Sequence, residues 1–201
     1  MELKILHLSD THGTHNKLTD LPEADILVHS GDFTFSGSRT ETYEFFNWLH
    51  SLPYKHKIIV PGNHDEFLYN RKPDCFKSNE HYLYNCGVEI EGLKFWGVPL
   101  FIKDAIGPKQ DKFYNEIPKG TDVLITHAPP HGILDKDGKI SYGSKVLLDR
   151  VIAVRPALHL FGHVHNAHGT FNDGSTLFSN AAIVDAQYNF FNRPALLTFN
   201  R

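Results

Sequence analysis

The first apolar segment of the chain ends in two residues that could bind a metal ion. Asp10 and His12 stand two positions apart, directly after the apolar pattern of residues 3–8. In open α/β sheets, ligands bind beyond the carboxyl ends of the strands. A carboxylate and an imidazole fixed there on one rigid element are typical of a metal site. An Asp-x-His pair is common by itself, so this interpretation depends on whether the pattern recurs.

The pattern recurs after four further apolar runs, at residues 26–29, 58–60, 123–125 and 158–161. Each run is followed by an acid, an amide or an imidazole: Asp32, Asn63 with His64, His127, and His163 with His165. Glycine precedes three of these polar tips, and glycine permits tight turns and a close approach of the backbone to a bound ion. Five coincidences of this kind are improbable. We therefore predict that the five strand ends converge on one site.

Converging strand ends would bring together seven oxygen and nitrogen donors: Asp10, His12, Asp32, Asn63, His127, His163 and His165. This set is too large for one ion and suits two divalent ions that share a carboxylate, for which Asp32 is our bridging candidate. The donors include no thiolate, so they suit Mn²⁺, Fe²⁺/³⁺, Zn²⁺, Co²⁺ or Ni²⁺ and leave the metal open. Two ions roughly 3.5–4 Å apart can clamp a phosphoryl group and lower the pKa of a bridging water.

The leaving alkoxide of a phosphoester also needs a proton or a positive neighbour. His64 directly follows Asn63, so we expect its side chain to point away from the ions and yet to stay near them. This position predicts a general acid or an electrostatic stabiliser. Asp65 could orient His64, although an acidic residue at the start of a helix is an equally good interpretation.

Two segments with helical periodicity flank the predicted strands. Residues 40–51 form the first predicted helix, with Thr40 as a possible N-cap and Pro53 ending it. Residues 144–154 form the second, which Pro156 ends. Such alternation of strands and helices predicts a single α/β domain over residues 1–201, with two packed sheets and helices outside them.

The middle and the end of the chain follow other patterns. Short strands are predicted at residues 82–84, 88–90, 93–96, 169–171, 176–179 and 195–199, with a tight turn at 91–92. Residues 65–70 are a predicted short helix. We expect residues 99–118 to form a long irregular loop with a helical turn near 111–115.

Composition limits the function classes that fit. The chain has 201 residues, 41% of them hydrophobic, and a formal net charge of −3. An acidic balance argues against a sequence-independent grip on nucleic acid, so we do not expect a nucleic acid polymer as a partner. No apolar run reaches the roughly 18–20 residues that cross a bilayer. Since the first strand begins at Leu3, we expect no signal peptide and no membrane partner.

Cysteine and histidine usage adds two further expectations. Cys75 and Cys86 lie outside every motif, and we expect reduced thiols in a cytoplasmic protein, with a local disulfide as the alternative. Three histidines lie within strands and are expected to be packed or bonded to the backbone: His7, His29 and His159. Three others lie a few residues beyond a motif, and whether a loop brings them to the substrate stays open: His15, His131 and His168.

Five motifs follow one another between residues 10 and 165: Asp10-x-His12, Gly31-Asp32, Gly62-Asn63-His64-Asp65, His127 and Gly162-His163-x-His165. In this order they resemble the calcineurin-like metallophosphoesterase superfamily. The resemblance implies a four-layer α/β/β/α sandwich with a dinuclear metal centre. It assigns one metal to Asp10, His12, Asp32 and His165. It assigns the other metal to Asp32, Asn63, His127 and His163, with Asp32 bridging.

The residues after Asp32 separate this chain from one branch of the superfamily. Protein phosphatases carry Asp-Arg-Gly at this point, whereas Phe33 and Thr34 follow Asp32 here. The missing arginine argues against protein phosphatase activity. The segments Gly31-Asp32-Phe33-Thr34 and His127-Ala128-Pro129-Pro130 are similar to small metallophosphodiesterases related to the animal brain metallophosphoesterase-domain proteins.

These observations predict a metal-dependent phosphodiesterase that acts on small phosphodiesters, with cyclic nucleotides as one class to test. Hydrolysis would use a metal-activated hydroxide, with His64 assisting the leaving group. A phosphomonoesterase or a nuclease of the same superfamily is an alternative, although a nuclease should carry a more basic surface. A non-catalytic scaffold on the same fold is a further alternative, against which the complete ligand set argues. The physiological substrate and the oligomeric state stay open.

Overall fold

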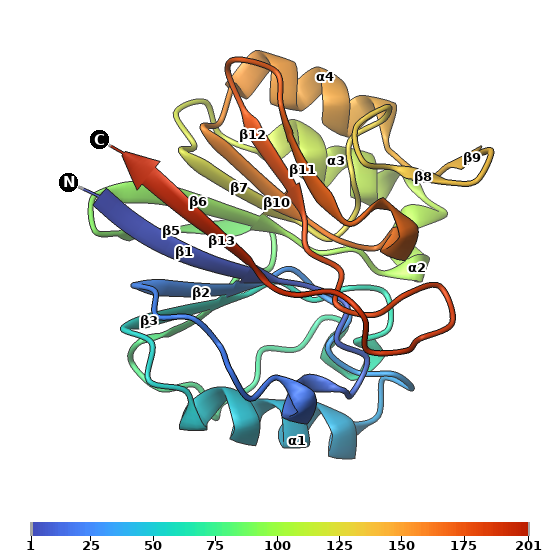
Figure 1. The fold of residues 1–201 in the computed structure, drawn as a ribbon. Helices are drawn as coiled ribbons and strands as arrows, with labels where there is room; N and C mark the ends of the chain where they lie inside the picture. The colour runs from blue at the N-terminus through green and yellow to red at the C-terminus, as the bar shows by residue number, and fades with distance from the viewer. Residues whose placement is uncertain (1, 201) are drawn as a thin grey trace.

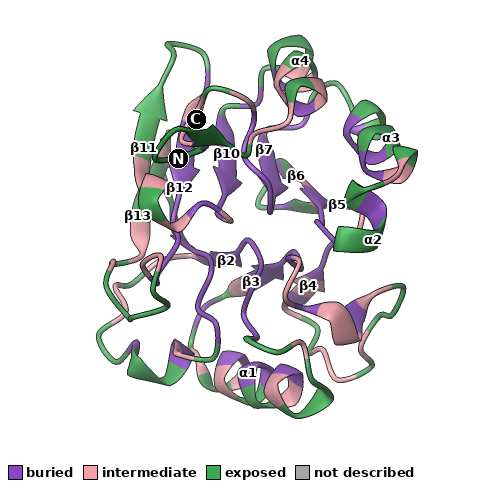
Figure 2. Cartoon of the chain, turned by 90° about the vertical axis from the view of Figure 1, so that its right-hand side faces the viewer, coloured by how far each residue is buried: buried purple, intermediate pink, exposed green. Residues whose placement is uncertain are grey.

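Two β-sheets pack face to face between helices in the computed structural model of the chain, which describes residues 2–200 (Figure 1). The expected α/β/β/α sandwich is confirmed. Helix α1 (Arg39–Ser51) covers the outer face of one sheet, and helices α3 (Pro108–Glu116) and α4 (Lys145–Val154) cover the outer face of the other. The central strands of both sheets are buried, whereas edge strands and the outer sides of the helices are exposed (Figure 2).

The first sheet carries three of the predicted polar tips. Its strands, in order across the sheet, are β13 (Ala195–Asn200), β1 (Glu2–Leu8), β2 (Ile26–His29), β3 (His56–Ile59) and β4 (Glu80–Tyr82). Strands β1 to β4 run parallel, and β13 pairs antiparallel with β1. Because parallel strands end at the same edge of a sheet, the tips of β1, β2 and β3 lie together.

The second sheet carries the other two tips. Its order is β11 (Gly169–Asn172), β12 (Leu177–Asn180), β10 (Leu158–Phe161), β7 (Val123–Thr126), β6 (Leu93–Val98) and β5 (Cys86–Ile90). The four central strands run parallel, and β5 and β11 pair antiparallel at the two edges. A small hairpin, β8 (Lys136–Asp137) with β9 (Ile140–Ser141), lies outside both sheets.

Strand periodicity divides the core into layers. In β2, Ile26 and Val28 pack between the two sheets, whereas Leu27 packs beneath α1 beside Phe45. Successive side chains of a strand point to opposite faces, so a strand buried on both faces reads as a continuous apolar run. Full burial of one such aliphatic side chain contributes about 1.5–3 kcal/mol. The polar tips are thus held at the ends of rigid, doubly buried strands.

Helix α1 begins earlier than predicted. Its N-cap is Ser38, whose hydroxyl accepts the N–H of Glu41, while the Glu41 carboxylate accepts the N–H of Ser38. This reciprocal pair satisfies two backbone donors that the first turn leaves free. The prediction of Thr40 as the N-cap was wrong, because Glu41 stands three residues after Ser38 and completes a capping box there.

The prediction of a long irregular loop at residues 99–118 was also wrong. This segment contains α2 (Ile102–Ala105) and α3, of which the predicted helical turn is only a part. Pro108 starts α3 with its backbone φ preset for a helix. Phe113 and Tyr114 bury one side of α3 against the second sheet. The apolar contacts of these two aromatic residues thus stabilise a helix for which the local sequence signal is weak.

Two shorter elements differ from the predictions, and one agrees. Residues 65–70 contain only a three-residue 3₁₀ helix, η2 (Glu66–Leu68). The strand expected at 82–84 is β4, which pairs in parallel with β3 and is shifted two residues toward the N-terminus. Its Glu80 carboxylate pairs with the buried ammonium of Lys57, which fixes this register. The turn at 91–92 is confirmed, since Ile90 pairs with Leu93 across it.

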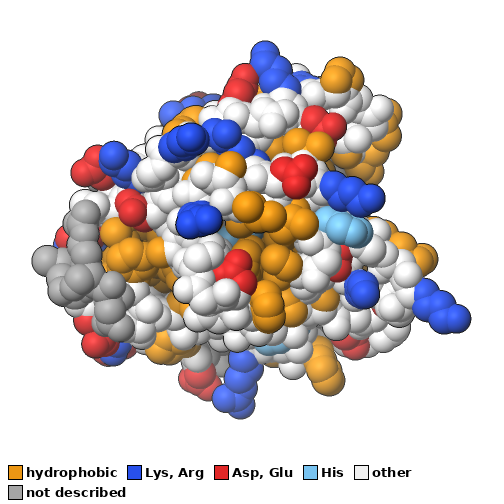
Figure 3. Space-filling model, turned by 90° about the horizontal axis from the view of Figure 1, so that it is seen from above, with side chains coloured by type: hydrophobic (Ala, Val, Ile, Leu, Met, Phe, Trp, Pro, Cys, Tyr) orange, Lys and Arg blue, Asp and Glu red, His pale blue; other side chains and the backbone are white. Residues whose placement is uncertain are grey.

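The structure also describes the helices, the surface charges and the two cysteines. In the described part of the chain, residues 2–200, no helix is long and apolar enough to cross a membrane. On the face seen in Figure 3, Lys and Arg side chains are interspersed with Asp and Glu. Cys75 and Cys86 are both free, so the alternative of a local disulfide is not realised in the structure.

The three strand histidines are fully buried, as expected, and pair with hydroxyl groups. His7 contacts the hydroxyls of Ser30 and Ser179 at 2.9 Å each, and His159 contacts the Thr126 hydroxyl at 2.9 Å. His29 contacts the hydroxyl of Thr11. Burial lowers the pKa of His159 to about 3, so this imidazole is neutral in the folded protein.

Replacing His159 by glutamine is expected to flatten the pH dependence of stability. The unfolded chain binds a proton at His159 below pH ~6.5, whereas the folded chain does not bind it until about pH 3. Stability therefore falls as the pH drops through this window, by at most about 1.4 kcal/mol per pH unit for this group. Urea unfolding of wild type and His159→Gln between pH 4.5 and 7 measures the two slopes. Equal slopes would contradict the assignment.

Candidate metal centre

The polar tips of five strands meet in one cluster of donor atoms. Potential ligand residues form three overlapping groups, and within each group the ligand atoms lie within 4.8 Å of one another. The groups are Asp10, His12 and His165; His12, Asp32 and His64; and Asp32, His127 and His163. His12 links the first group to the second, and Asp32 links the second to the third. The structure therefore brings six of the seven predicted ligands together as one continuous centre built from both sheets. It also places a ring nitrogen of His64 within 4.8 Å of ligand atoms of His12 and Asp32, although the sequence predicted that this side chain points away from the ions.

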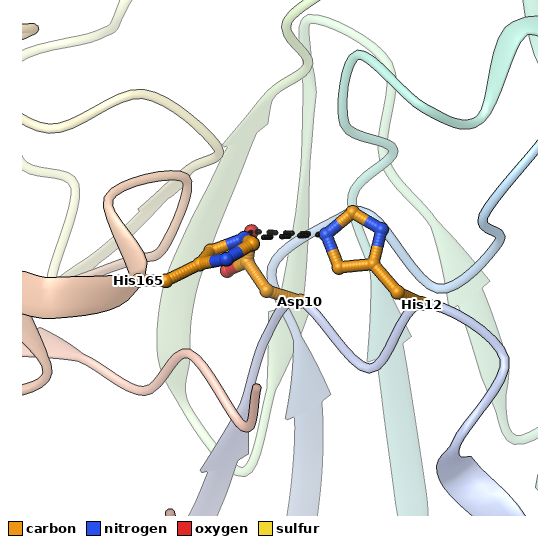
Figure 4. A group of neighbouring side chains, drawn as sticks. All are labelled: Asp10, His12 and His165. Atoms are coloured by element: carbon orange, nitrogen blue, oxygen red, sulfur yellow. Dashed lines mark hydrogen bonds and ion pairs between the residues drawn. The ribbon is translucent and has the colours of Figure 1, made fainter. Parts of the chain in front are cut away.

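One half of the centre lies around Asp10, as Figure 4 shows. His165 Nε2 lies 3.4 Å from Asp10 Oδ1 and 3.3 Å from His12 Nε2. His12 Nε2 also lies 3.7 Å from Asp32 Oδ2. The two imidazoles thus face each other beside two buried carboxylates, although they come from strand ends more than 150 positions apart in the chain.

The other half lies around Asp32. His127 Nε2 lies 3.3 Å from Asp32 Oδ2 and 3.1 Å from Asn63 Oδ1. The ring of His163 packs edge-on to that of His127, with the ring centroids 5.2 Å apart. Asp32 therefore stands between the two halves, where the sequence predicted a bridging carboxylate.

Backbone carbonyls fix the orientation of three imidazoles. The Nδ1 atoms of His127, His165 and His64 lie 2.9, 3.0 and 2.7 Å from the carbonyl oxygens of Ser30, Asp185 and Phe35. A carbonyl oxygen only accepts, so each Nδ1 carries hydrogen and each neutral ring presents an Nε2 lone pair. For His127 and His165 these lone pairs face carboxylates and other acceptors. Such a set of acceptors fits a bound cation.

The pKa values follow from this crowding. Burial opposes protonation of His127, but Asp32 and Asp10 outweigh it and raise the pKa of the imidazole to about 9. Burial lowers the pKa of His12 and of His163 to about 4. The centre can thus neutralise its carboxylates with a proton on His127 or with a metal cation, and each opposes the binding of the other.

Four of the predicted ligands have a strained backbone. Asp10, His12, Asp32 and His163 have φ angles of 52°, 40°, 56° and 69°, in the left-handed region that side-chain-bearing residues rarely adopt. Each such residue costs about 1–2 kcal/mol. Hydrogen bonds stabilise these strained conformations. For example, the N–H of His163 donates to both carboxylate oxygens of Asp10. Strain of this kind collects at functional sites, where it preorganises side chains.

Two glycines, Gly62 and Gly162, lie so close to carboxylates of the centre that no larger residue would fit. A Cβ atom on Gly62 would lie 2.2 Å from Asp32 Oδ1, and one on Gly162 would lie 2.0 Å from Asp10 Oδ2. Neither glycine has a positive φ, so the requirement here is space and not conformation. The glycines that precede the polar tips therefore allow two strand ends to approach each other.

Asp65 stands at the start of η2, as one of the two interpretations from the sequence expected, but its side chain makes no capping hydrogen bond there and supports the centre instead. Its carboxylate accepts the backbone N–H groups of Asp32, Gly62 and Thr34, and the Thr34 hydroxyl. Within residues 2–200, these bonds account for the hydrogen bonds of its carboxyl group, and none goes to the ring of His64. Burial and the nearby Asp32 raise the pKa of Asp65 to about 7. Asp65 thus ties the Asp32 loop to the Gly62 loop.

A cavity of about 220 Å³ opens over the centre. It is lined by predicted residues, Asp32, Asn63, His64, His163 and His165, and by residues outside the motifs, among them Asp137, Tyr142, Asn166 and Tyr188. A larger cavity of about 740 Å³ lies beside Leu18 and Tyr54 and contains none of the donors. The smaller cavity is therefore the one that matters for chemistry at the centre.

The three histidines whose role was left open lie elsewhere. In the described part of the chain, none of them lines the cavity over the centre. His15 packs against Phe45 and Trp48, His131 contacts the Ser141 hydroxyl, and His168 contacts the Arg193 carbonyl.

Tyr188 lines the cavity but follows none of the motifs, so the sequence analysis missed it. The only local signal for it is the aromatic cluster at residues 188–191 after the turn-forming Asp185.

The amino-acid sequence of the chain is similar to a known family and to known proteins. The family model described as calcineurin-like phosphoesterase matches residues 3–167. The chain is 35% identical over 204 residues to UPF0046 protein K07C11.7 of Caenorhabditis elegans, covering 90% of this chain and 69% of that protein. It is 33% identical over 229 residues to metallophosphoesterase domain-containing protein 1 of Homo sapiens, covering 94% and 69%.

Solved structures share the fold at low sequence identity. TT1561 of Thermus thermophilus superimposes with a TM-score of 0.62 at 15% identity, covering 100% of this chain and 99% of that one. Purple acid phosphatase PPD1 from yellow lupin superimposes with a TM-score of 0.56 at 11% identity, covering 90% of this chain and 44% of that one. At these identities the likeness supports the fold alone.

Proposed function

The chain belongs to the calcineurin-like phosphoesterase family, and from this premise we propose that it is a two-metal phosphodiesterase acting on small phosphodiesters. The observation that carries the proposal is the convergence of Asp10, His12, Asp32, His127, His163 and His165 in overlapping ligand groups, with Asn63 beside His127. Structural metal sites are closed and four-coordinate, whereas this larger set lies under an open cavity.

The ligands divide into two sets that share one carboxylate. Asp10, His12, Asp32 and His165 would hold one ion, and Asp32, Asn63, His127 and His163 would hold the other. When bound, the two ions would polarise the phosphoryl oxygens and lower the pKa of water. The identity of the metal is left open by these donors.

The cavity favours a singly charged substrate. Among the described lining residues, none is lysine or arginine, and Asp137 adds an acidic group. A phosphomonoester carries up to two negative charges and is commonly gripped by an arginine. A phosphodiester carries one negative charge and has less need of such a partner. The lining therefore supports a diesterase over a monoesterase, and cyclic nucleotides are one class of diester to test.

His64 is placed to donate a proton to the leaving group. Its Nδ1 is held by the Phe35 carbonyl, and its backbone N–H donates to Asp32 Oδ1 at 2.7 Å. The ring lines the cavity, and within residues 2–200 its one hydrogen bond is at Nδ1, so we assign Nε2 to the substrate. An imidazolium in this orientation holds its second proton at Nε2 and can give it to the departing alkoxide.

The test of this proposal is hydrolysis of bis-p-nitrophenyl phosphate and of p-nitrophenyl phosphate by protein supplied with Mn²⁺. We expect a preference for the diester and two metal ions per chain by elemental analysis. A preference for the monoester would support a phosphomonoesterase, and turnover of single-stranded DNA alone would support a nuclease. Two bound ions with no turnover of any of these substrates would contradict the enzymatic proposal and support a scaffold.

Replacing His64 by alanine is expected to lower kcat without loss of metal. A positioned general acid contributes roughly 10²- to 10⁴-fold. The loss should be larger for diphenyl phosphate than for bis-p-nitrophenyl phosphate, because phenolate is the poorer leaving group and needs the proton more. Measuring kcat on both substrates and the metal content checks this, with His81→Ala on β4 as the control. An equal loss on both substrates, or loss of metal, would point to a ligand role instead.

A further inference from the structure

Two exposed aromatic side chains lie at the metal centre, Tyr188 in the lining of the cavity and Phe35 next to Tyr188 and His12. Tyr188 is 40% exposed, and its ring lies 4.8 Å from that of His12 and 5.3 Å from that of His165. Phe35 is 52% exposed, and its ring lies 5.3 Å from that of Tyr188 at an interplanar angle of 80°. Because both rings remain this exposed, burial in the core does not explain their position.

The loop that carries Tyr188 is built to hold it in place. Tyr188 has a φ of 61°, a strained conformation for a bulky residue. One oxygen of the Asp185 carboxylate accepts the N–H groups of Gln187 and Asn189 at 2.8 and 2.9 Å. Its other oxygen accepts the side-chain amide of Asn189 at 3.2 Å. Strain that the surrounding hydrogen bonds maintain at a surface position points to a role in function.

Both aromatic residues belong to segments that also hold histidines of the centre. The Asp185 carbonyl bonds Nδ1 of His165, and the Phe35 carbonyl bonds Nδ1 of His64. The backbone segment that carries each ring is thus held next to a histidine of the centre. A ring attached to the phosphoryl group through an ester oxygen would lie within reach of Phe35 and Tyr188.

We propose that Phe35 and Tyr188 form an aromatic wall that binds a planar ring of the substrate, so that the enzyme selects phosphodiesters of aromatic or heteroaromatic alcohols. This inference rests on the proposed function and narrows its substrate class. Aromatic rings pack well edge-to-face or offset-stacked, and the two wall residues present both an edge and a face. The wall offers little to a simple alkyl diester, whose ester group has no π surface.

The experiment compares two probes that bind without being hydrolysed. Methyl(phenyl)phosphinate and dimethylphosphinate each carry one negative charge, as a phosphodiester does, and they differ in that a phenyl ring replaces one methyl group. With Mn²⁺-loaded wild type, calorimetry should give a Kd at least about tenfold lower for the phenyl probe. Tyr188→Asn keeps a residue that tolerates the left-handed backbone and removes the ring, and Phe35→Leu removes the other ring. Each should reduce the Kd ratio severalfold and leave the Kd of dimethylphosphinate unchanged.

Two controls separate stacking from structural effects. Tyr188→Phe retains the ring and should retain the Kd ratio. Phe171→Leu removes an equally exposed ring on β11, outside the wall, and should leave both Kd values at the wild-type level. If Tyr188→Asn weakened both probes equally, Tyr188 would act through His12 and His165, and the wall would be rejected. A wild type with no preference for the phenyl probe would reject it as well.

The same preparation distinguishes failure of the wall from failure of the proposed function. Turnover of bis-p-nitrophenyl phosphate without a phenyl preference in binding would reject the wall alone. A phenyl preference that depends on Tyr188, with no turnover of any diester, would support the wall and reject the phosphodiesterase.

Discussion

Replacing Asp32 by asparagine is expected to remove metal binding at the shared position and to lower phosphoester hydrolysis on the order of 10³-fold or more. The Asp32 carboxylate is almost fully buried, and its Oδ2 lies 3.3 Å from His127 Nε2 and 3.7 Å from His12 Nε2. Asparagine has the same shape and keeps an oxygen to accept the N–H of His64. It loses the negative charge that both halves of the centre share, so both ions should be affected.

Metal content by elemental analysis and kcat/KM on bis-p-nitrophenyl phosphate measure this effect. Circular dichroism should show an unchanged fold, because the substitution alters charge and not volume. Asp20→Asn, at an exposed acidic position outside the ligand groups, is the matched control and should retain both metal and activity. Two ions per chain and full activity in Asp32→Asn would rule out Asp32 as the bridging ligand.

Gly62→Ala should have the second large effect, on both stability and metal content. The added methyl group would lie 2.2 Å from Asp32 Oδ1, 2.6 Å from the Asp32 backbone nitrogen and 2.7 Å from His127 Cε1. A backbone nitrogen at the end of a buried strand cannot move aside as a flexible side chain can. Overpacking of this kind costs about 1–3 kcal/mol. For a chain of this size, each kcal/mol lowers Tm by about 2–4 °C.

Thermal unfolding with and without Mn²⁺ tests the prediction. In Gly62→Ala the displaced Asp32 carboxylate should also reduce the increase in Tm that bound metal gives the wild type. Gly107→Ala is the matched control, since Gly107 also lacks a positive φ and a Cβ there meets nothing closer than 4.0 Å. A wild-type Tm and metal content in Gly62→Ala would show that the two strand ends can separate without cost.

Local sequence patterns predicted most of the strands, because a run of apolar residues indicates a strand that is buried on both faces. The run Ile26-Leu27-Val28 is apolar at every position, and the structure buries it on both faces of β2. Residues 99–118 lack such a run, and their helices depend on contacts of Phe113 and Tyr114 with a sheet that the local sequence does not describe. The capping box at Ser38 is a local signal that could have been found, whereas the position of β4 follows from the distant Lys57.

The sequence by itself determined which donors this protein could bring to a metal centre. Apolar runs set the strands, parallel strands end at one edge, and the polar residues after them therefore converge on it. Only the tertiary structure decided how the donors are oriented. His127 takes its orientation from the Ser30 carbonyl 97 positions away, and Asp10 is held by the N–H of His163 153 positions away. Tyr188 reaches the cavity for the same reason: long-range packing places it, and no local periodicity encodes such contacts.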